Sequence, residues 1–243
     1  MRKLKYGLLL ILTMILFSIP VLAAQTYYLP SKIECKEESY YKKYSYDKHG
    51  HLIGSKENGE ETDGELEDEY YYNYDKNGKR ISGWYKEELG LELNLSFDKN
   101  QYLKYKQYEN WYEGGRTNYE WNKKGYLARE DKKVKYTYYF SNDGRLKKSA
   151  KYTDGKKEYL SYYNKDGLLS KTISYADKTT TKYEYKFNKN GLVTTIIKNI
   201  TDNKTKKKTV KKITVSYSKT KTDKKTYSLF INGNDSCFTN ALL

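Results

Sequence analysis

The sequence predicts an all-β protein made of tandem β-hairpins, and three observations carry that prediction. A short motif of an aromatic residue, Asp or Asn, and Gly recurs seven times at a spacing near 23 residues. Aromatic and polar residues alternate before the motif, as at Tyr70, Tyr72 and Tyr74. Tyrosine dominates the aromatic residues, with 30 Tyr against 6 Phe and 3 Trp. A fixed period of this size is typical of a repeat array, and alternation is typical of half-buried strands.

Each motif is expected to form the turn of a hairpin. The clearest copy is Tyr74-Asp75-Lys76-Asn77-Gly78, followed by Ile81. The Asp or Asn side chain accepts hydrogen bonds from the turn backbone, and Gly adopts the positive φ that closes the turn. The seven turns are expected at 46–50, 74–78, 97–101, 121–125, 140–144, 163–167 and 187–191.

The hairpins predict an antiparallel meander of about fourteen strands over residues 27–200. A leading strand is expected near Ile33, and C-terminal strands within 201–243 are expected near Ile213–Tyr217 and Tyr227–Ile231. No helix is expected after the first 24 residues. A sheet this long with one aromatic face must curl into a spiral, close into a barrel or fold back as a sandwich, and alternation leaves these three outcomes open.

The N-terminus reads as a secretory signal peptide over residues 1–24. A basic start at Arg2 and Lys3 precedes the apolar run Leu8–Phe17, and small residues suit cleavage after Ala23. An uncleaved anchor is the alternative, although the run is shorter than the roughly 20 residues of a spanning helix. Residues 25–243 then form a single β-repeat domain that is secreted or held at the cell surface. An outer-membrane barrel is not expected, because neither face of the strands is consistently lipid-like.

The motifs Tyr46-Asp47-x-x-Gly50 and Tyr74-Asp75-x-x-Gly78 resemble the YD-repeat (Tyr-Asp, Rhs-like) family of bacterial secreted and surface proteins. The lead-in Leu29–Ile33 also looks like that of small secreted relatives, and the resemblance covers about residues 27–200. It implies a small member without a toxin. Several copies depart from the motif, at Gln101, Asn122, Ser141, Asn164 and Asn188.

Four aromatic residues between motifs are candidate ligand contacts: Trp84, Tyr85, Trp111 and Tyr112. Their segments, 83–85 and 110–115, look like pieces of choline-binding or glucan-binding cell-wall repeats. Aromatic faces stack on sugar rings while their polar tips form hydrogen bonds. Packing in the core is the alternative interpretation of the same residues.

Charge is divided unevenly along the chain. Residues 25–130 carry 17 basic and 21 acidic side chains, whereas residues 131–243 carry 26 basic and 10 acidic ones. The basic half predicts an anionic polymer or glycan of the cell envelope or a host surface as partner, with Lys206, Lys207 and Lys208 as contacts. A solvated lysine-rich face is the alternative. Nucleic acid is not expected, because the protein is exported and contains none of the known recognition modules.

No catalytic, cofactor or metal site is predicted. His49 and His51 are the only histidines and read as turn residues, and the acidic run Glu57–Glu69 lacks the spacing of a calcium loop. Cys35 and Cys237 are expected to form a disulfide in an oxidising compartment, with two free thiols as the alternative. The sequence therefore predicts a non-enzymatic binding module, and a structural or interaction scaffold without a small ligand is the second hypothesis.

Overall fold

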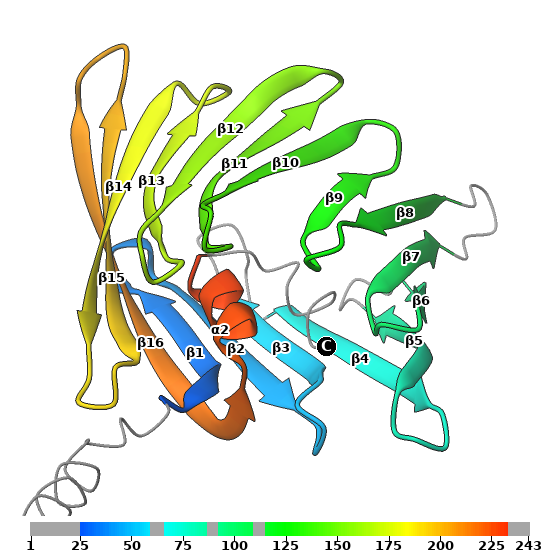
Figure 1. The fold of residues 1–243 in the computed structure, drawn as a ribbon. Coiled ribbons are helices and arrows are strands. Elements are labelled where there is room, and N and C mark those ends of the chain that lie inside the picture. Colours follow the sequence, from blue (N-terminus) through cyan, green and yellow to red (C-terminus); the bar gives the residue numbers. More distant parts are fainter. Residues whose placement is uncertain (1–24, 59–65, 87–91, 109–114, 233–243) are drawn as a thin grey trace, which may run out of the picture.

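The computed structural model describes residues 25–58, 66–86, 92–108 and 115–232. Sixteen antiparallel strands form one sheet that closes into a barrel (Figure 1). The strands are β1 (Tyr27–Cys35), β2 (Tyr40–Tyr46), β3 (Leu52–Asn58), β4 (Leu66–Tyr74), β5 (Arg80–Lys86), β6 (Glu92–Phe97), β7 (Leu103–Tyr108), β8 (Arg116–Trp121), β9 (Leu127–Glu130), β10 (Val134–Phe140), β11 (Leu146–Thr153), β12 (Lys156–Tyr163), β13 (Leu169–Ser174), β14 (Thr179–Phe187), β15 (Val193–Asp202) and β16 (Lys208–Thr222). The all-β prediction is confirmed, and strands β2–β15 are the fourteen strands of the predicted hairpins.

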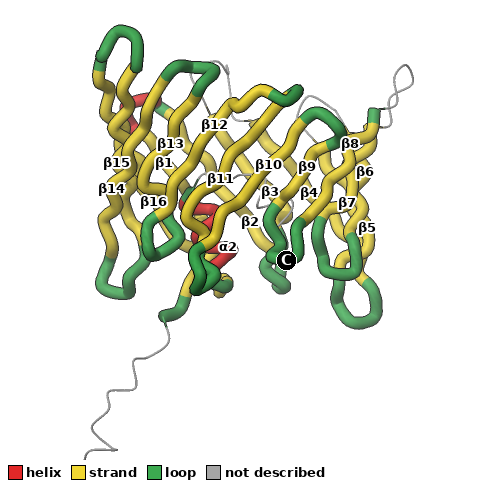
Figure 2. Tube along the Cα trace, turned by 45° about the horizontal axis from the view of Figure 1, so that its top comes forward, coloured by secondary structure: helices red, strands yellow, loops and turns green. Residues whose placement is uncertain are grey.

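The predicted turns connect the paired strands of each repeat. In the turn at 75–78, the Asp75 backbone N–H donates to the Lys79 carbonyl at 2.8 Å, and the Asp75 carboxylate accepts from the backbone N–H groups of Asn77 and Lys79. Gly78 has φ +75°, and one extra residue, Ile81 between Arg80 and Ser82, shifts the register as a bulge. Because the sheet is a meander, all seven motif turns lie at one end of the barrel, which we call the motif-turn end (Figure 2).

Closure joins the first strand to the last. Strand β1 pairs with β2 on one side and with β16 on the other. The β1–β16 register runs from Tyr27 opposite Thr222 to Cys35 opposite Ile213. Alternation in the sequence did not distinguish a barrel from a spiral or a sandwich. The barrel removes both free sheet edges, whose unpaired backbone groups would otherwise face solvent.

A helix follows the last strand, where the sequence predicted a strand near Tyr227–Ile231. Helix α2 (Lys224–Ile231) begins at Asp223, whose carboxylate accepts from the backbone N–H groups of Lys225 and Thr226. Tyr227, Phe230 and Ile231 are buried against the barrel wall. The strand prediction was wrong, because a short apolar run fits either period and the spacing i, i+3, i+4 of these three residues is helical. Figure 1 shows α2 inside the barrel.

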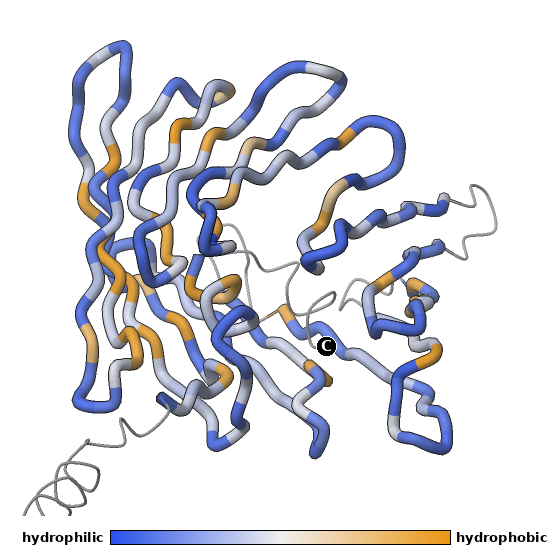
Figure 3. Tube along the Cα trace, viewed as in Figure 1, coloured by the Kyte–Doolittle hydropathy of each residue, from blue (hydrophilic) through white to orange (hydrophobic). Residues whose placement is uncertain are grey.

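The two walls of the barrel differ in chemistry. The core around α2 contains inward residues such as Leu29, Tyr44 and Leu103. The opposite side chains of the same strands point outward and include charged residues around the whole circumference, among them Lys56, Glu69, Arg116 and Lys182. Hydrophilic residues accordingly occur along every part of the barrel (Figure 3). Among the described residues, no helix is long and apolar enough to cross a membrane.

Candidate functional site

The structure places the predicted neighbours Trp84 and Tyr85 on opposite walls. Trp84 points outward and stacks on Tyr71 across the β4–β5 pair, with ring centroids 3.9 Å apart and an interplanar angle of 8°. Tyr85 points inward, where its hydroxyl donates to Asp68 Oδ1 at 3.0 Å and its ring stacks on Tyr70. Trp84 and Tyr85 therefore lie on opposite surfaces of the sheet. The prediction that both contact one ligand on one surface does not fit this arrangement.

The predicted lysines lie at the turn between β15 and β16. Lys206, Lys207 and Lys208 are exposed at the end of the barrel opposite the motif turns. The Lys206 ammonium group donates to the Asn203 carbonyl at 2.7 Å, within the same turn. Since β16 is five strands from β5 in the sheet order, the structure does not bring these lysines together with Trp84.

Several predicted residues lie outside the described part of the chain. These are Trp111, Tyr112, Cys237 and the signal peptide at 1–24. Cys35 is a buried thiol whose Sγ donates to Glu37 Oε2 at 3.6 Å, and burial raises the pKa of this thiol. The disulfide between Cys35 and Cys237 stays a prediction, which non-reducing mass spectrometry of the exported protein tests.

The outer wall over β10–β13 carries a pattern that the sequence did not reveal. Cross-strand partners alternate between lysine and tyrosine in two rows. One row runs Tyr139, Lys148, Tyr162, Lys171, and the other runs Lys135, Tyr152, Lys157. A third row between them holds Thr137, Ala150, Leu160 and Ile173. We call the seven lysine and tyrosine residues of the two outer rows the lysine–tyrosine face.

Three of the four lysines of this face lie over neighbouring tyrosine rings. Lys148 Nζ is 5.4 Å from the Tyr139 ring centroid and 5.8 Å from that of Tyr162, while Lys171 Nζ is 4.9 Å from the same Tyr162 ring. Lys157 Nζ is 5.7 Å from the Tyr152 ring. None of the residues that form these three rows on β10–β13 is acidic. The ammonium groups of Lys148, Lys157 and Lys171 are thus oriented by aromatic contacts, and no acidic residue of the three rows pairs with them.

The sequence contains these lysines and tyrosines but could not place them together. Tyr138 and Tyr139 are adjacent, yet only Tyr139 points outward, because successive side chains of a strand alternate between faces. Which of the two points outward depends on register, and register depends on the bulge that follows each motif turn. The basic composition of residues 131–243 was the one signal available without the structure.

The fold places His49 in a turn, as the sequence predicted, but buries His51. His49 lies in the turn at 47–50 and is exposed, whereas His51 is 7% exposed and its Nδ1 lies 3.0 Å from the Tyr74 hydroxyl. The rings are 6.0 Å apart between centroids. No group of three or more His, Cys, Asp or Glu side chains among the described residues could hold a metal ion.

Comparison with known proteins supports the fold and leaves the family unassigned. No family model matches the chain, and no curated protein matches it. The chain is similar to the crystal structure of a porin-like protein from Bacteroides uniformis ATCC 8492, with a TM-score of 0.56 and 14% sequence identity. The match covers 78% of this chain and 96% of the porin-like chain. At this identity the likeness shows the β-barrel fold alone, and membership of the YD-repeat family stays a prediction.

Proposed function

We propose that the protein is an exported binding module that engages an anionic glycan polymer through the lysine–tyrosine face. The observation that carries this proposal is the alternation of lysine and tyrosine across β10–β13 without an acidic residue in the rows. Tyrosine rings stack on sugar rings, and the interleaved ammonium groups attract carboxylate or sulfate groups of the same polymer.

The spacing of the face suits an extended chain. Neighbouring strands lie about 4.8 Å apart, so lysines on alternate strands, such as Lys148 and Lys171, are separated by about 10 Å. The two rows are four residues apart along β10, which corresponds to about 14 Å. A polymer that crosses the strands therefore meets a positive charge and an aromatic ring in turn, whereas a compact anion would contact a single lysine.

The outer wall is expected to face water. Outward charges such as Lys56, Glu69 and Arg116 also lie on strands outside the lysine–tyrosine face. A lysine or arginine at the midplane of a bilayer costs about 2–4 kcal/mol on the lipid face of a barrel. Several such residues together favour a protein that stays soluble without detergent. Purified residues 25–243 should elute as a folded species in detergent-free buffer, and recovery only from detergent extracts would contradict this expectation.

The binding test compares three polymers of similar length. Polygalacturonate carries both carboxylates and sugar rings, poly-L-glutamate carries carboxylates alone, and dextran carries sugar rings alone. In titration calorimetry we expect affinity to decrease in the order polygalacturonate, poly-L-glutamate, dextran. Binding should weaken steeply as salt rises, because exposed charges act over about 8–10 Å at physiological ionic strength.

Charge reversal locates the site. The double variant Lys148→Glu and Lys171→Glu should weaken polygalacturonate binding at low salt by about tenfold or more, since each exposed ion pair contributes up to about 1 kcal/mol. The matched control is Lys206→Glu with Lys207→Glu, which changes net charge equally at a turn outside the face. Equal loss in both variants would refute the face as the site. Failure of all three polymers to bind would favour the scaffold hypothesis.

A further inference from the structure

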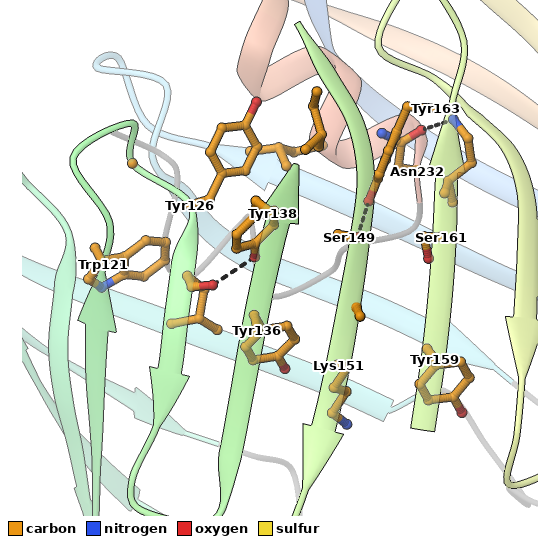
Figure 4. Close-up of a pocket in the computed structure, with 16 residues that line it drawn as sticks. Trp121, Tyr126, Tyr136, Tyr138, Ser149, Lys151, Tyr159, Ser161, Tyr163 and Asn232 are labelled. Carbon is orange, nitrogen blue, oxygen red and sulfur yellow. Dashed lines mark hydrogen bonds between the residues drawn. The ribbon is translucent and has the colours of Figure 1, made fainter. Parts of the chain in front are cut away.

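The barrel interior holds a cavity of about 220 Å³ between α2 and strands β8–β13. Figure 4 shows its walls, with Tyr136 and Tyr138 from β10, Ser149 from β11, and Tyr159 and Ser161 from β12. These residues are on the opposite side of the strands from the lysine–tyrosine face. The cavity is therefore separate from the surface of the proposed function.

Helix α2 closes the cavity at the motif-turn end. Asn232, just after the helix, accepts from the Leu169 backbone N–H at 2.7 Å and donates to the Gly167 carbonyl at 3.0 Å. Lys225 at the start of the helix donates to the Gly125 carbonyl at 2.7 Å. The helix is thus fixed to two motif turns on either side of the cavity, and Leu229 and Asn232 form part of its lining.

The lining combines aromatic rings with hydroxyl groups. The hydroxyls of Ser149 and Tyr163 are 2.9 Å apart, and the Tyr138 hydroxyl donates to the Leu127 carbonyl at 2.7 Å. The hydroxyls of Tyr159 and Ser161 form no hydrogen bond with the described residues. Burying those two groups under an apolar ligand would leave them without partners and would cost free energy. A ligand with hydroxyl groups of its own can satisfy them.

The charges near the cavity favour a neutral ligand. Lys151 is paired with Glu158 at 3.0 Å, and Tyr136, whose ring lines the cavity, donates to Glu130 Oε1 at 2.9 Å. Burial and the nearby carboxylates raise the pKa of Tyr136, so its hydroxyl stays protonated. Lys151 is the one cationic residue of the lining, and Glu158 already neutralises it, so an anionic ligand would meet no uncompensated positive charge.

The size of the cavity limits the ligand to one ring. Pockets for drug-sized ligands span about 300–1,000 Å³, and this cavity lies below that range. We infer that the cavity binds a single neutral sugar ring, stacked on tyrosine faces and hydrogen-bonded through Tyr159 and Ser161. This site is independent of the outer face, because its ligand carries no charge and lies inside the barrel.

Titration calorimetry of residues 25–243 with D-glucose, D-galactose, D-mannose and N-acetyl-D-glucosamine tests the inference. At least one sugar should bind at millimolar concentrations, with an affinity that does not change between low and high salt. Tyr159→Phe should weaken binding about fivefold to tenfold through loss of one hydrogen bond. Ser161→Leu should abolish binding by filling the cavity.

The control is Tyr162→Phe, which removes a hydroxyl from the outward neighbour on the same strand and should leave sugar affinity unchanged. Thermal unfolding identifies any variant that has lost its fold, and Tyr159→Phe, which changes one atom, keeps the test valid if Ser161→Leu does not fold. Absence of binding by all four sugars would overturn the inference, as would unchanged affinity in folded Tyr159→Phe and Ser161→Leu. Because neutral sugars do not depend on Lys148 or Lys171, failure here is distinct from failure of the polymer proposal.

Discussion

Protonation of His51 should destabilise the barrel at mildly acidic pH. His51 is buried, and its Nδ1 lies 3.0 Å from the Tyr74 hydroxyl, which in turn donates to Asp47 Oδ2. Since the tyrosine has one proton to donate, Nδ1 of the neutral imidazole must be the donor to Tyr74. Burial and the positive charge of Arg80 lower the pKa of His51 from 6.5 to about 4, and Asp47 only partly opposes this shift.

The sign and size of this change in stability follow from the linkage between proton binding and folding. Between about pH 6.5 and pH 4 the unfolded chain binds a proton at His51 and the folded protein does not, so stability falls as pH falls. Each pKa unit corresponds to about 1.4 kcal/mol, so the complete loss is about 3 kcal/mol. Hydrogen bonds from the Tyr74 hydroxyl and the His51 backbone lower the pKa of Asp47 despite its burial. Its protonation therefore adds a further loss only at more acidic pH.

Urea unfolding at neutral pH and near pH 4 measures the effect. His51→Gln should remove about 3 kcal/mol of the difference between the two conditions, whereas His49→Gln, at the exposed position in the same turn, should not. In the His49→Gln protein the single remaining imidazole can be titrated by NMR. Arg80→Met should raise its pKa, because the neighbouring positive charge is gone. A titration midpoint at or above 6.5, or an unchanged acid loss in His51→Gln, would refute the reasoning.

Three further outcomes are expected. Gly125→Ala should destabilise the fold more than Gly155→Ala, as measured by urea unfolding. Both glycines have positive φ, which costs alanine about 1 kcal/mol, but a Cβ at Gly125 would lie 1.9 Å from the Tyr102 hydroxyl whereas the space at Gly155 is open. Asp223→Ala should lower thermal stability by about 1 kcal/mol through loss of the α2 cap, and an unchanged melting curve would contradict this role. In the reduced protein, the buried Cys35 thiol should react with iodoacetamide only after unfolding, and rapid labelling of the native state would show that it is accessible.

The hairpins were predictable because their signals are local. The motif turns need only a side-chain acceptor and a residue with positive φ within five positions, and Asp75 and Gly78 provide both. Gln101 replaces glycine with φ +70°, and its side chain accepts from the Arg80 backbone N–H at 2.7 Å. This contact between neighbouring hairpins accompanies the departure from the motif, and no local rule would have predicted it.

Helix α2 was not predicted because its short sequence fits both a strand and a helix. Tyr227–Ile231 is short, apolar and preceded by strands, so a strand was the simpler prediction. The deciding features are the Asp223 cap and the clamps that Lys225 and Asn232 form with distant motif turns. Such contacts join residues about 65 to 100 positions apart and exist only in the closed barrel.

The sequence by itself determined the fourteen strands of the hairpins, the seven turns and the division of charge, because alternation, turn chemistry and composition act over a few residues. The tertiary structure decided closure of the sheet, the position of α2 and the face on which each side chain lies. Trp84 and Tyr85 illustrate the reason, since a strand sends adjacent side chains to opposite walls. Register and closure depend on pairing between distant strands, so only the folded barrel separates an outer face of lysine and tyrosine from an inner cavity lined by tyrosine.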